Sequence, residues 1–437
     1  MLVPQLDRPL RLDDYREIAP EEQLDKVRDL AADLKGLRIV HVNSTADGGG
    51  VAEILRSLVP LMRDVGLDAQ WLVMPGHEAF FEITKKLHNL MQGADGELSA
   101  QEVSAYAAQC WKVSRAMQEQ GISADIWVMH DPQSLPLAAF LPQNQHAMWV
   151  CHIDTTAPNQ SAAGTLLPWL QTYPLIVFSL PQYILPGLDP CQTRVAPPAI
   201  DPLLGKNCRP DLATAKSIIA RLGIDPERPL VSQVARFDVW KDPWGVIDAY
   251  RMVKREQPDV QVALLGVIAA QDDPEAFSIF DSVAQYAGDD PDIHLFIDGR
   301  QVAEAEVAAV QTAAAVIIQK SLREGFGLSV TEALWKGTPV VGGNCGGIRL
   351  QIIDGQTGFL VDTVEECAER VLTLLRDQPL AQHMGNAGKE WVRQQFLTPR
   401  LLSNYLEFSH ELLSGSGSFN PVINDRAARK GVPRLGT

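Results

Sequence analysis

A short apolar run that ends in a glycine-rich turn and continues as an amphipathic helix constrains the fold of this chain most. Residues 37–42 are rich in β-branched side chains, with Ile39, Val40 and Val42, as in a strand buried within a parallel sheet. Residues 43–50 end in three consecutive glycines, and residues 51–65 then place their apolar side chains on one helical face. Units of strand, turn and helix build parallel sheets that are covered by helices on both faces.

The same alternation continues along the first half of the chain. We expect a helix at 101–120 and strands at 69–74, 125–130, 147–153 and 175–180. Residues 194–202 are rich in proline and cannot continue a sheet or a helix comfortably, so we expect the hinge there.

A second alternation follows the proline-rich segment. It predicts helices at 211–222 and 244–257, a final helix at 399–413, and strands at 229–234, 260–266, 293–297, 315–319 and 339–342. We therefore expect an α/β protein with two facing Rossmann-like domains and a cleft between them. Residues 1–200 would form the first domain and residues 201–399 the second, with 400–437 packing back on the first.

Length and composition agree with two globular domains and exclude some partners. The 437 residues exceed one ordinary core, and no apolar run approaches the ~18 residues of a membrane span. A net charge of −16 disfavours nucleic acids and anionic membrane surfaces. The six cysteines are scattered, and residues 1–14 lack the apolar core of a signal peptide, so we expect reduced thiols in the cytoplasm.

The stretch 321–332 is the strongest candidate for a functional site. It follows an apolar run that ends at residue 319, and it opens a helix that Gly337 should end. Glu324 and Glu332 flank a turn of small residues at the carboxyl edge of the sheet, where open α/β sheets bind ligands. Free amides at a helix start suit a phosphate, and carboxylates suit sugar hydroxyls. The stretch therefore predicts a nucleotide-sugar site.

Two other segments have a phosphate-binding and a purely structural interpretation. The glycines at 48–50 would let a diphosphate approach a helix start, or would simply form a tight turn. Arg236 and Lys241 follow an apolar strand and could neutralise a leaving diphosphate. Equally, they could be exposed cations that pair with Asp238 and Asp242.

Two histidines lie at the ends of predicted strands. His152 follows the strand that ends at residue 151, where its ring would face the space between the domains, and His130 is followed by Asp131. A lone histidine at such a place is more often structural than functional, and the Asp131-Pro132 pair also suits a turn. Neither histidine has a second one at i+3 or i+4, so the sequence does not predict a metal site.

Taken together, these motifs resemble the retaining glycosyltransferases of the two-domain GT-B fold. Glu324 and Glu332 match the E-x7-E element of that group, and Arg236 and Lys241 match its Arg/Lys pair. The similarity runs from about residue 37 to residue 413. Within the group, residues 41–45, 48–55, 130–133, 151–154 and 271–275 are most similar to the trehalose glycosyltransferring synthases.

The resemblance implies a role for each matching residue. Glu324 would bond a donor-sugar hydroxyl, Glu332 the ribose hydroxyls, and His152 would line the donor sugar near the reacting carbon. Arg236 and Lys241 would stabilise the diphosphate as the glycosidic bond breaks. The other donor-binding residues implied are Gly48, Gly49, Gly50, Gly325, Phe326, Gly327 and Leu328. Acceptor-binding residues would be Asp47, His130 and Asp131.

The implied reaction is retaining transfer of glucose from UDP-, ADP- or GDP-glucose to free glucose, forming trehalose. No metal-binding aspartate motif stands out in the sequence, so we expect no metal cofactor, with Mg²⁺ at most stimulatory. The sequence is compatible with a homodimer. Other small sugar or polyol acceptors, such as glycerol, glycerate or a sugar phosphate, remain open. So do a nucleotide-sugar epimerase or phosphorylase with the same architecture, and a nucleotide-sugar sensor without turnover.

Overall fold

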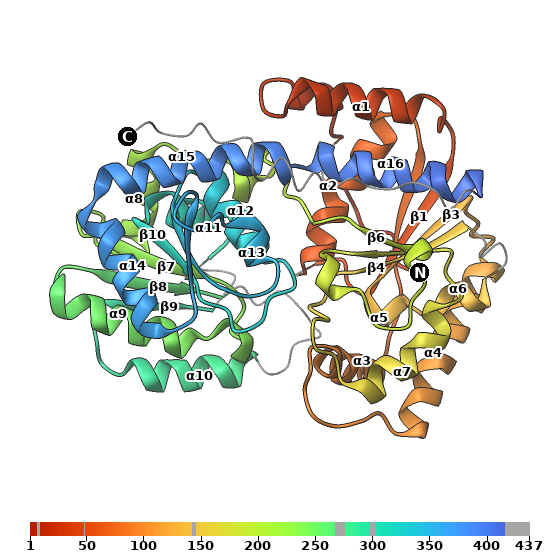
Figure 1. Ribbon diagram of the computed structural model, residues 1–437, viewed down its shortest axis with the longest axis horizontal. Coiled ribbons are helices and arrows are strands. Elements are labelled where there is room, and N and C mark those ends of the chain that lie inside the picture. Colours follow the sequence, from red (N-terminus) through yellow and green to blue (C-terminus); the bar gives the residue numbers. More distant parts are fainter. Residues whose placement is uncertain (7–8, 48, 142–145, 267–275, 298–301, 416–437) are drawn as a thin grey trace.

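The strands of the chain form two separate parallel sheets (Figure 1). The structure is a computed structural model, and it describes residues 1–6, 9–47, 49–141, 146–266, 276–297 and 302–415. Within these residues each sheet has six strands, and all neighbouring strands of both sheets run parallel. The expected α/β architecture is therefore confirmed.

The first sheet has the strand order β2-β1-β3-β4-β5-β6. Its strands are β1 (Arg38–Asn43), β2 (Asp68–Val73), β3 (Ile126–His130), β4 (Ala147–Cys151), β5 (Leu175–Phe178) and β6 (Thr193–Val195). The helices of this half are α1 (Glu21–Ala32), α2 (Gly50–Asp64), α3 (Glu78–Met91), α4 (Ala100–Glu119), α5 (Asp131–Ser134), α6 (Leu137–Phe140) and α7 (Gln160–Leu170). β3 and β4 are buried at every residue, because helices cover both faces of the sheet.

One prediction about this half was wrong. The proline-rich segment was expected to belong to no sheet, but its first residues, Arg194 and Val195, lie in β6. β6 pairs with β5 on one side only, with Val177 opposite Arg194. An edge strand of three residues can end just before Pro197 without losing a hydrogen bond of the sheet.

The second sheet has the order β12-β11-β10-β7-β8-β9. Its strands are β7 (Leu230–Val234), β8 (Gln261–Leu265), β9 (Ile293–Phe296), β10 (Val316–Gln319), β11 (Val340–Gly343) and β12 (Gly358–Val361). Its helices are α8 (Leu212–Arg221), α9 (Pro243–Glu256), α10 (Ala276–Ala287), α11 (Glu304–Ala313), α12 (Leu328–Trp335), α13 (Ile348–Gln351), α14 (Val364–Arg376) and α15 (Gln378–Gln395). The order places β10 beside β7, so the segments that follow these two strands emerge at one edge.

The chain crosses between the two halves twice, and the two crossings lie side by side. The amide of Ile200 donates to the carbonyl of Phe396 at 2.9 Å, and the amide of Thr398 donates to the carbonyl of Ile200 at 3.0 Å. Beyond the second crossing, α16 (Thr398–Ser414) packs on α1 and α2 of the first half (Figure 1). A helix near the C-terminus therefore completes the core of the N-terminal half. None of the described helices combines the length and apolar character that a membrane crossing requires.

Candidate active site

The stretch that follows β10 has the local structure that its sequence predicted. Gly327 is the N-cap of α12 and adopts a φ of 86°, a left-handed conformation that favours glycine. Gly337, with a φ of 76°, follows the C-cap of the same helix. Glu324 lies before the turn and Glu332 lies within α12, so one tight turn places both carboxylates near the carboxyl edge of the sheet.

Glu324 is paired with Lys241, which comes from the segment after β7. The Nζ of Lys241 lies 2.5 Å from Oε2 of Glu324, and the hydroxyl of Ser321 lies 3.3 Å from the same oxygen. Glu324 is only 8% exposed. The pairing of Lys241 with Asp242 that the sequence allowed is wrong, because Asp242 forms an ion pair with Lys320 instead, with Nζ 2.6 Å from Oδ2. Two residues 83 positions apart thus form one charged unit.

Arg236, like Lys241, lies in the segment that follows β7. It forms a 3.7 Å ion pair with Asp238, as the structural interpretation of the sequence allowed, and its side chain is 38% exposed. Its charge also acts on His88 of α3, whose pKa falls to about 3, chiefly because the ring is buried. Arg236 therefore faces the first half of the chain.

Glu332 is buried among cations. Lys206 lies 2.7 Å from its Oε1, and the amide of Gln311 lies 3.3 Å from its Oε2. Burial alone would raise the pKa of Glu332, but the ammonium groups of Lys206 and Lys336 outweigh burial and lower it. Lys206 also binds Glu53 of α2 at 2.6 Å. One ammonium group therefore joins the two halves through a carboxylate from each.

Gly325 brings the backbones of the two halves together. A Cβ atom built on Gly325 would lie 2.4 Å from the carbonyl oxygen of His152, far inside van der Waals contact. Tyr183 of the first half adds a second contact, since its buried hydroxyl lies 2.8 Å from the carbonyl of Glu324 and 2.9 Å from that of Gly325. The structure thus places two predicted site residues, Gly325 and His152, against each other.

The glycine-rich turn of the first half lies near the start of α12. Gly48 is outside the described residues, while Gly49 is the N-cap of α2 and Gly50 its first residue. A Cβ on Gly50 would lie 3.3 Å from the side chain of Leu328. Asp47 lies before α2, is exposed and pairs with Arg56 of α2, so its carboxylate is held by the helix that follows it.

His152 is linked to His130 and Asp131 at the ends of β3 and β4. Its amide donates to Oδ1 of Asp131 at 2.8 Å, and its Nε2 lies 3.1 Å from Nδ1 of His130. Asp131 has a φ of 58°, which is rare for a residue other than glycine, and burial raises the pKa of its carboxyl. Strained backbone of this kind is concentrated at functional sites.

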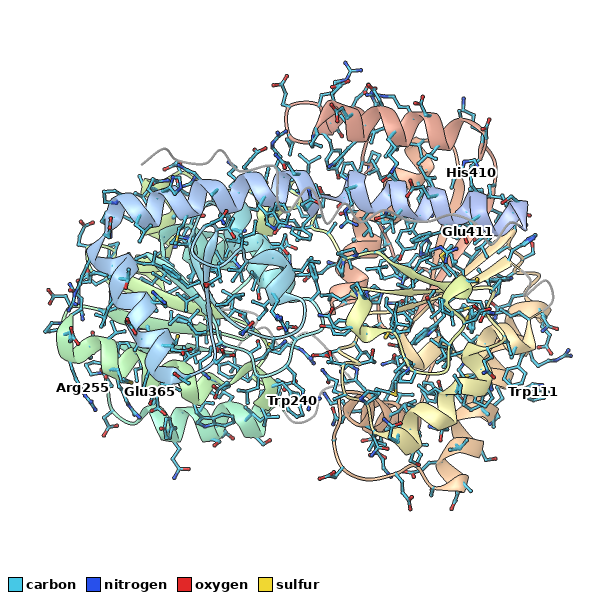
Figure 2. All side chains as sticks on the ribbon, viewed as in Figure 1. Trp111, Trp240, Arg255, Glu365, His410 and Glu411 are labelled. Atoms are coloured by element: carbon cyan, nitrogen blue, oxygen red, sulfur yellow. The ribbon has the colours of Figure 1, made fainter. Side chains whose placement is uncertain are left out.

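A further contact between the halves was not predicted. The guanidinium of Arg323 lies over the ring of Trp240, 5.2 Å from its centroid, and donates to the carbonyl of Gln92 at the end of α3. Figure 2 shows Trp240 at the boundary between the two halves. Arg323, Tyr183 and Lys206 could not be singled out from the sequence, because each acts through a partner in the other half.

Phe326 is buried rather than presented to the boundary. Its ring lies edge-on to Phe396, with centroids 5.6 Å apart, and it is 5% exposed. Its side chain therefore packs within the second half, against Phe396. The predicted residues that the structure brings together are thus Lys241 with Glu324, Gly325 with His152, Gly50 with Leu328, and His130 with Asp131 and His152.

Two facing parallel sheets, with charged and glycine residues meeting where they adjoin, define a group 1 glycosyltransferase of the GT-B fold. Residues 41–185 match the family described as "Trehalose synthase, N-terminal domain", and residues 215–391 match "Glycosyl transferases group 1". The trehalose synthase of Rubrobacter xylanophilus is 46% identical over 405 residues, which cover 92% of this chain and 97% of the relative. The chain therefore belongs to the trehalose synthase family and is a glycosyltransferase.

Solved structures support the fold. The α,α-trehalose 6-phosphate synthase of Burkholderia multivorans superposes with a TM-score of 0.68 at 14% identity, covering 87% of this chain and 99% of that one. A protein from Anabaena, solved in complex with UDP and glucose, superposes with a TM-score of 0.62 at 15% identity, covering 87% and 100%. At these identities the likeness shows that the GT-B fold is shared.

Proposed function

We propose that this protein transfers glucose, with retention, from a nucleotide-activated glucose to free glucose and so forms trehalose. The observation that carries the proposal is the buried Lys241–Glu324 pair, set at 2.5 Å beside the point where Gly325 meets His152. A cation and a sugar-binding carboxylate at the boundary of two halves are the groups that a glycosyl diphosphate requires. The name of the Rubrobacter relative supports the product, and the UDP and glucose bound by the Anabaena protein support the substrates.

We assign the donor to residues 201–399 and the acceptor to residues 1–200. Lys241 and Arg236 would hold the diphosphate, and Glu324 would bind a hydroxyl of the transferred glucose. Glu332 would bind the ribose, which requires that Lys206 share it with the hydroxyls or move. On the acceptor side, the backbone and ring of His152 would border the reacting carbon.

The remaining assignments follow the same division. Gly49, Gly50 and the unplaced Gly48 would approach the diphosphate from the first half, opposite Leu328. Asp131 and His130 would support the acceptor side through His152, to whose amide and ring they bond. Asp47 is the weakest assignment, since an acceptor would compete for its carboxylate with Arg56.

The reaction that suits these groups is a front-face displacement. The bond between the anomeric carbon and the phosphate oxygen breaks while the acceptor oxygen bonds to the same face of that carbon. The acceptor's hydroxyl proton passes to the departing phosphate oxygen. Such a step needs stabilisation of the charge on the leaving diphosphate and exclusion of water more than it needs a strong base. In this mechanism none of the carboxylates acts as a nucleophile.

The test is to incubate the protein with UDP-, ADP- and GDP-glucose in turn, each with glucose, and to identify the product by anomeric NMR. We expect release of nucleotide that depends on glucose, and α,α-trehalose as product. Lys241→Met should lower kcat/KM by about 10²–10³-fold, because removal of one such donor costs about 2.7–4 kcal/mol of transition-state stabilisation. Lys112→Met, an exposed lysine of α4, is the matched control and should keep the wild-type rate.

Three results would overturn or redirect the proposal. If no donor and acceptor pair released nucleotide, the transferase function would be wrong. Release with glycerol, glycerate or a sugar phosphate, and none with glucose, would keep the donor and replace the acceptor. Turnover that required inorganic phosphate, or interconversion of the nucleotide sugars without an acceptor, would indicate a phosphorylase or an epimerase instead.

A further inference from the structure

Three histidine rings form a continuous hydrogen-bonded row that ends at His152. His41 lies in β1, His130 is the last residue of β3, and His152 follows β4, so three neighbouring strands supply them. Nδ1 of His41 lies 3.0 Å from Nε2 of His130, and Nδ1 of His130 lies 3.1 Å from Nε2 of His152. Successive rings are stacked, with centroids 5.4 Å apart and interplanar angles of 19° and 24°.

Burial keeps the three rings neutral. His41 is fully buried and lies against Tyr405 of α16, with ring centroids 5.5 Å apart, and burial lowers its pKa to about 3. Burial also lowers the pKa of His130 and of His152. A neutral imidazole has one N–H and one acceptor nitrogen. The two contacts therefore fix the protons of all three rings as a set, in one of two patterns.

The two patterns differ at both ends of the row. If each ring donates toward His152, the proton of His152 lies on Nδ1 and His41 keeps an unprotonated Nε2. If each ring donates toward His41, the proton of His152 lies on Nε2 and His41 carries an N–H at its own Nε2. Within the described residues, Nε2 of His41 is buried and has no hydrogen-bond partner.

The unpartnered Nε2 of His41 decides between the two proton patterns. A buried acceptor without a partner is tolerated more often than a buried N–H without one. We propose that His41 and His130 are positioning residues that hold His152 in the tautomer with its proton on Nδ1. Nδ1 of His152 is then a neutral hydrogen-bond donor. His152 is half-buried, and its carbonyl lies against Gly325.

This inference rests on the proposed function for what that donor meets. A neutral N–H suits an oxygen of the glucosyl diphosphate, since it bonds a hydroxyl or a phosphate oxygen without adding a third cation to Arg236 and Lys241. A ring with the opposite tautomer would present a lone pair to the same oxygen. Reversal of the row would therefore cost activity while it left the fold and the charge of the site intact.

The tautomer can be measured directly. In protein labelled with ¹⁵N-histidine, two-bond ¹H–¹⁵N spectra at pH 8 distinguish a protonated ring nitrogen from an unprotonated one. The signals of His152 are assigned by their loss in His152→Gln. We expect Nδ1 of His152 to carry the proton in the wild-type protein, and a proton on Nε2 would overturn the proposal. This arm needs no turnover, so it also stands if the chain transfers no glucose.

A matched pair of substitutions tests the positioning role. His130→Asn keeps an amide N–H near the position of Nδ1, which can donate to His152. His130→Asp has the same shape but only acceptors when ionised, which draws the proton of His152 to Nε2 as the carboxylate of a catalytic triad does for its histidine. Both substitutions remove the ring nitrogen of His130 that contacts His41. We expect the Asn variant to keep the wild-type tautomer and the Asp variant to reverse it.

Kinetics should follow the tautomer. At pH 8 the kcat of His130→Asp should fall about 100-fold relative to His130→Asn, in line with the loss of one transition-state donor. His383→Asn, on the exposed face of α15, should match the wild type and controls for the loss of a histidine. Equal His152 spectra or equal kcat values in the Asn and Asp variants would overturn the positioning role. If neither variant folds, the wild-type spectrum decides.

Discussion

Replacing Gly325 by alanine tests whether the contact between the two halves is required for activity. The added Cβ would lie 2.4 Å from the carbonyl oxygen of His152, whereas ordinary contacts begin at 3.4 Å. The backbone fixes the position of a Cβ and the carbonyl is itself backbone, so no side-chain rotation can relieve the overlap. The two segments must separate by about 1 Å, the difference between these distances.

A displacement of this size has a predictable cost. Misplacing reacting groups by about 1 Å can lower a rate about 10²-fold, which corresponds to about 2.7 kcal/mol of activation free energy. The contact joins the halves without entering the core of either, and Gly325 does not have a positive φ. We therefore expect kcat/KM to fall about 100-fold while each half keeps its fold.

The assay is the initial rate of glucose transfer, with thermal unfolding of the same samples. Gly164→Ala is the matched control, because Gly164 lies in α7 with open space around its Cβ position. An alanine there should leave the rate unchanged and favour the helix slightly. If Gly325→Ala kept kcat/KM within about threefold, the close approach of Gly325 to His152 would not be part of the active geometry.

Two further predictions concern stability. Lys206→Met should lower the free energy of unfolding by about 3 kcal/mol, because it leaves Glu332 buried without its closest cation, and a urea titration showing a loss below about 1 kcal/mol would contradict this. The neutral rings of His41 and His88, each with a pKa of about 3, stabilise the fold fully above about pH 6.5, and this stability is lost as the pH falls toward 3. For each of these two histidines, lowering the pH from 7.5 to 5.5 should reduce the free energy of unfolding by about 1.4 kcal/mol, as measured by urea titration. His88→Gln should weaken this pH dependence, whereas His383→Gln, at an exposed histidine, should not.

Local patterns carried most of the fold prediction. β1 and α2 were predictable because a buried β-branched run and an apolar helical stripe each have their own period. The helix of residues 78–91 was not predicted, although it became α3, and it supplies the carbonyl of Gln92 that Arg323 contacts. The edge strand β6 was missed because three residues beside prolines carry too short a pattern to read.

The site was predictable in its parts but not in its pairings. Lys241 and Glu324 were both singled out by sequence. The sequence did not pair them, because Asp242, the neighbour of Lys241, was an equally good partner. The structure separates those two neighbours, because Asp242 caps α9 by accepting from the amide of Gly245 at 3.1 Å and binds Lys320 with its other oxygen. A carboxylate so engaged leaves the adjacent lysine to reach Glu324.

His41 shows a signal that the sequence did contain. It lies between the apolar residues Val40 and Val42 in β1, where every residue from 39 to 43 is buried, and a buried polar side chain in such a position demands a hydrogen-bond partner. What the sequence lacked was the strand order, which places β1 beside β3 and β3 beside β4. Only that order turns three separate histidines into one row.

The contacts between the halves leave little room for adjustment, and this shapes how the site must work. Gly325 meets a carbonyl with no side chain between, the hydroxyl of Tyr183 reaches two carbonyls, and Lys206 is shared by two carboxylates. Only the Lys206 contact involves a long side chain, which could change its rotamer if one half rotated. The other two contacts have no such freedom. A rotation that separated the halves would therefore break the first two together. Since His152 and Glu324 belong to different halves, the proposed site exists only in the arrangement that keeps these contacts.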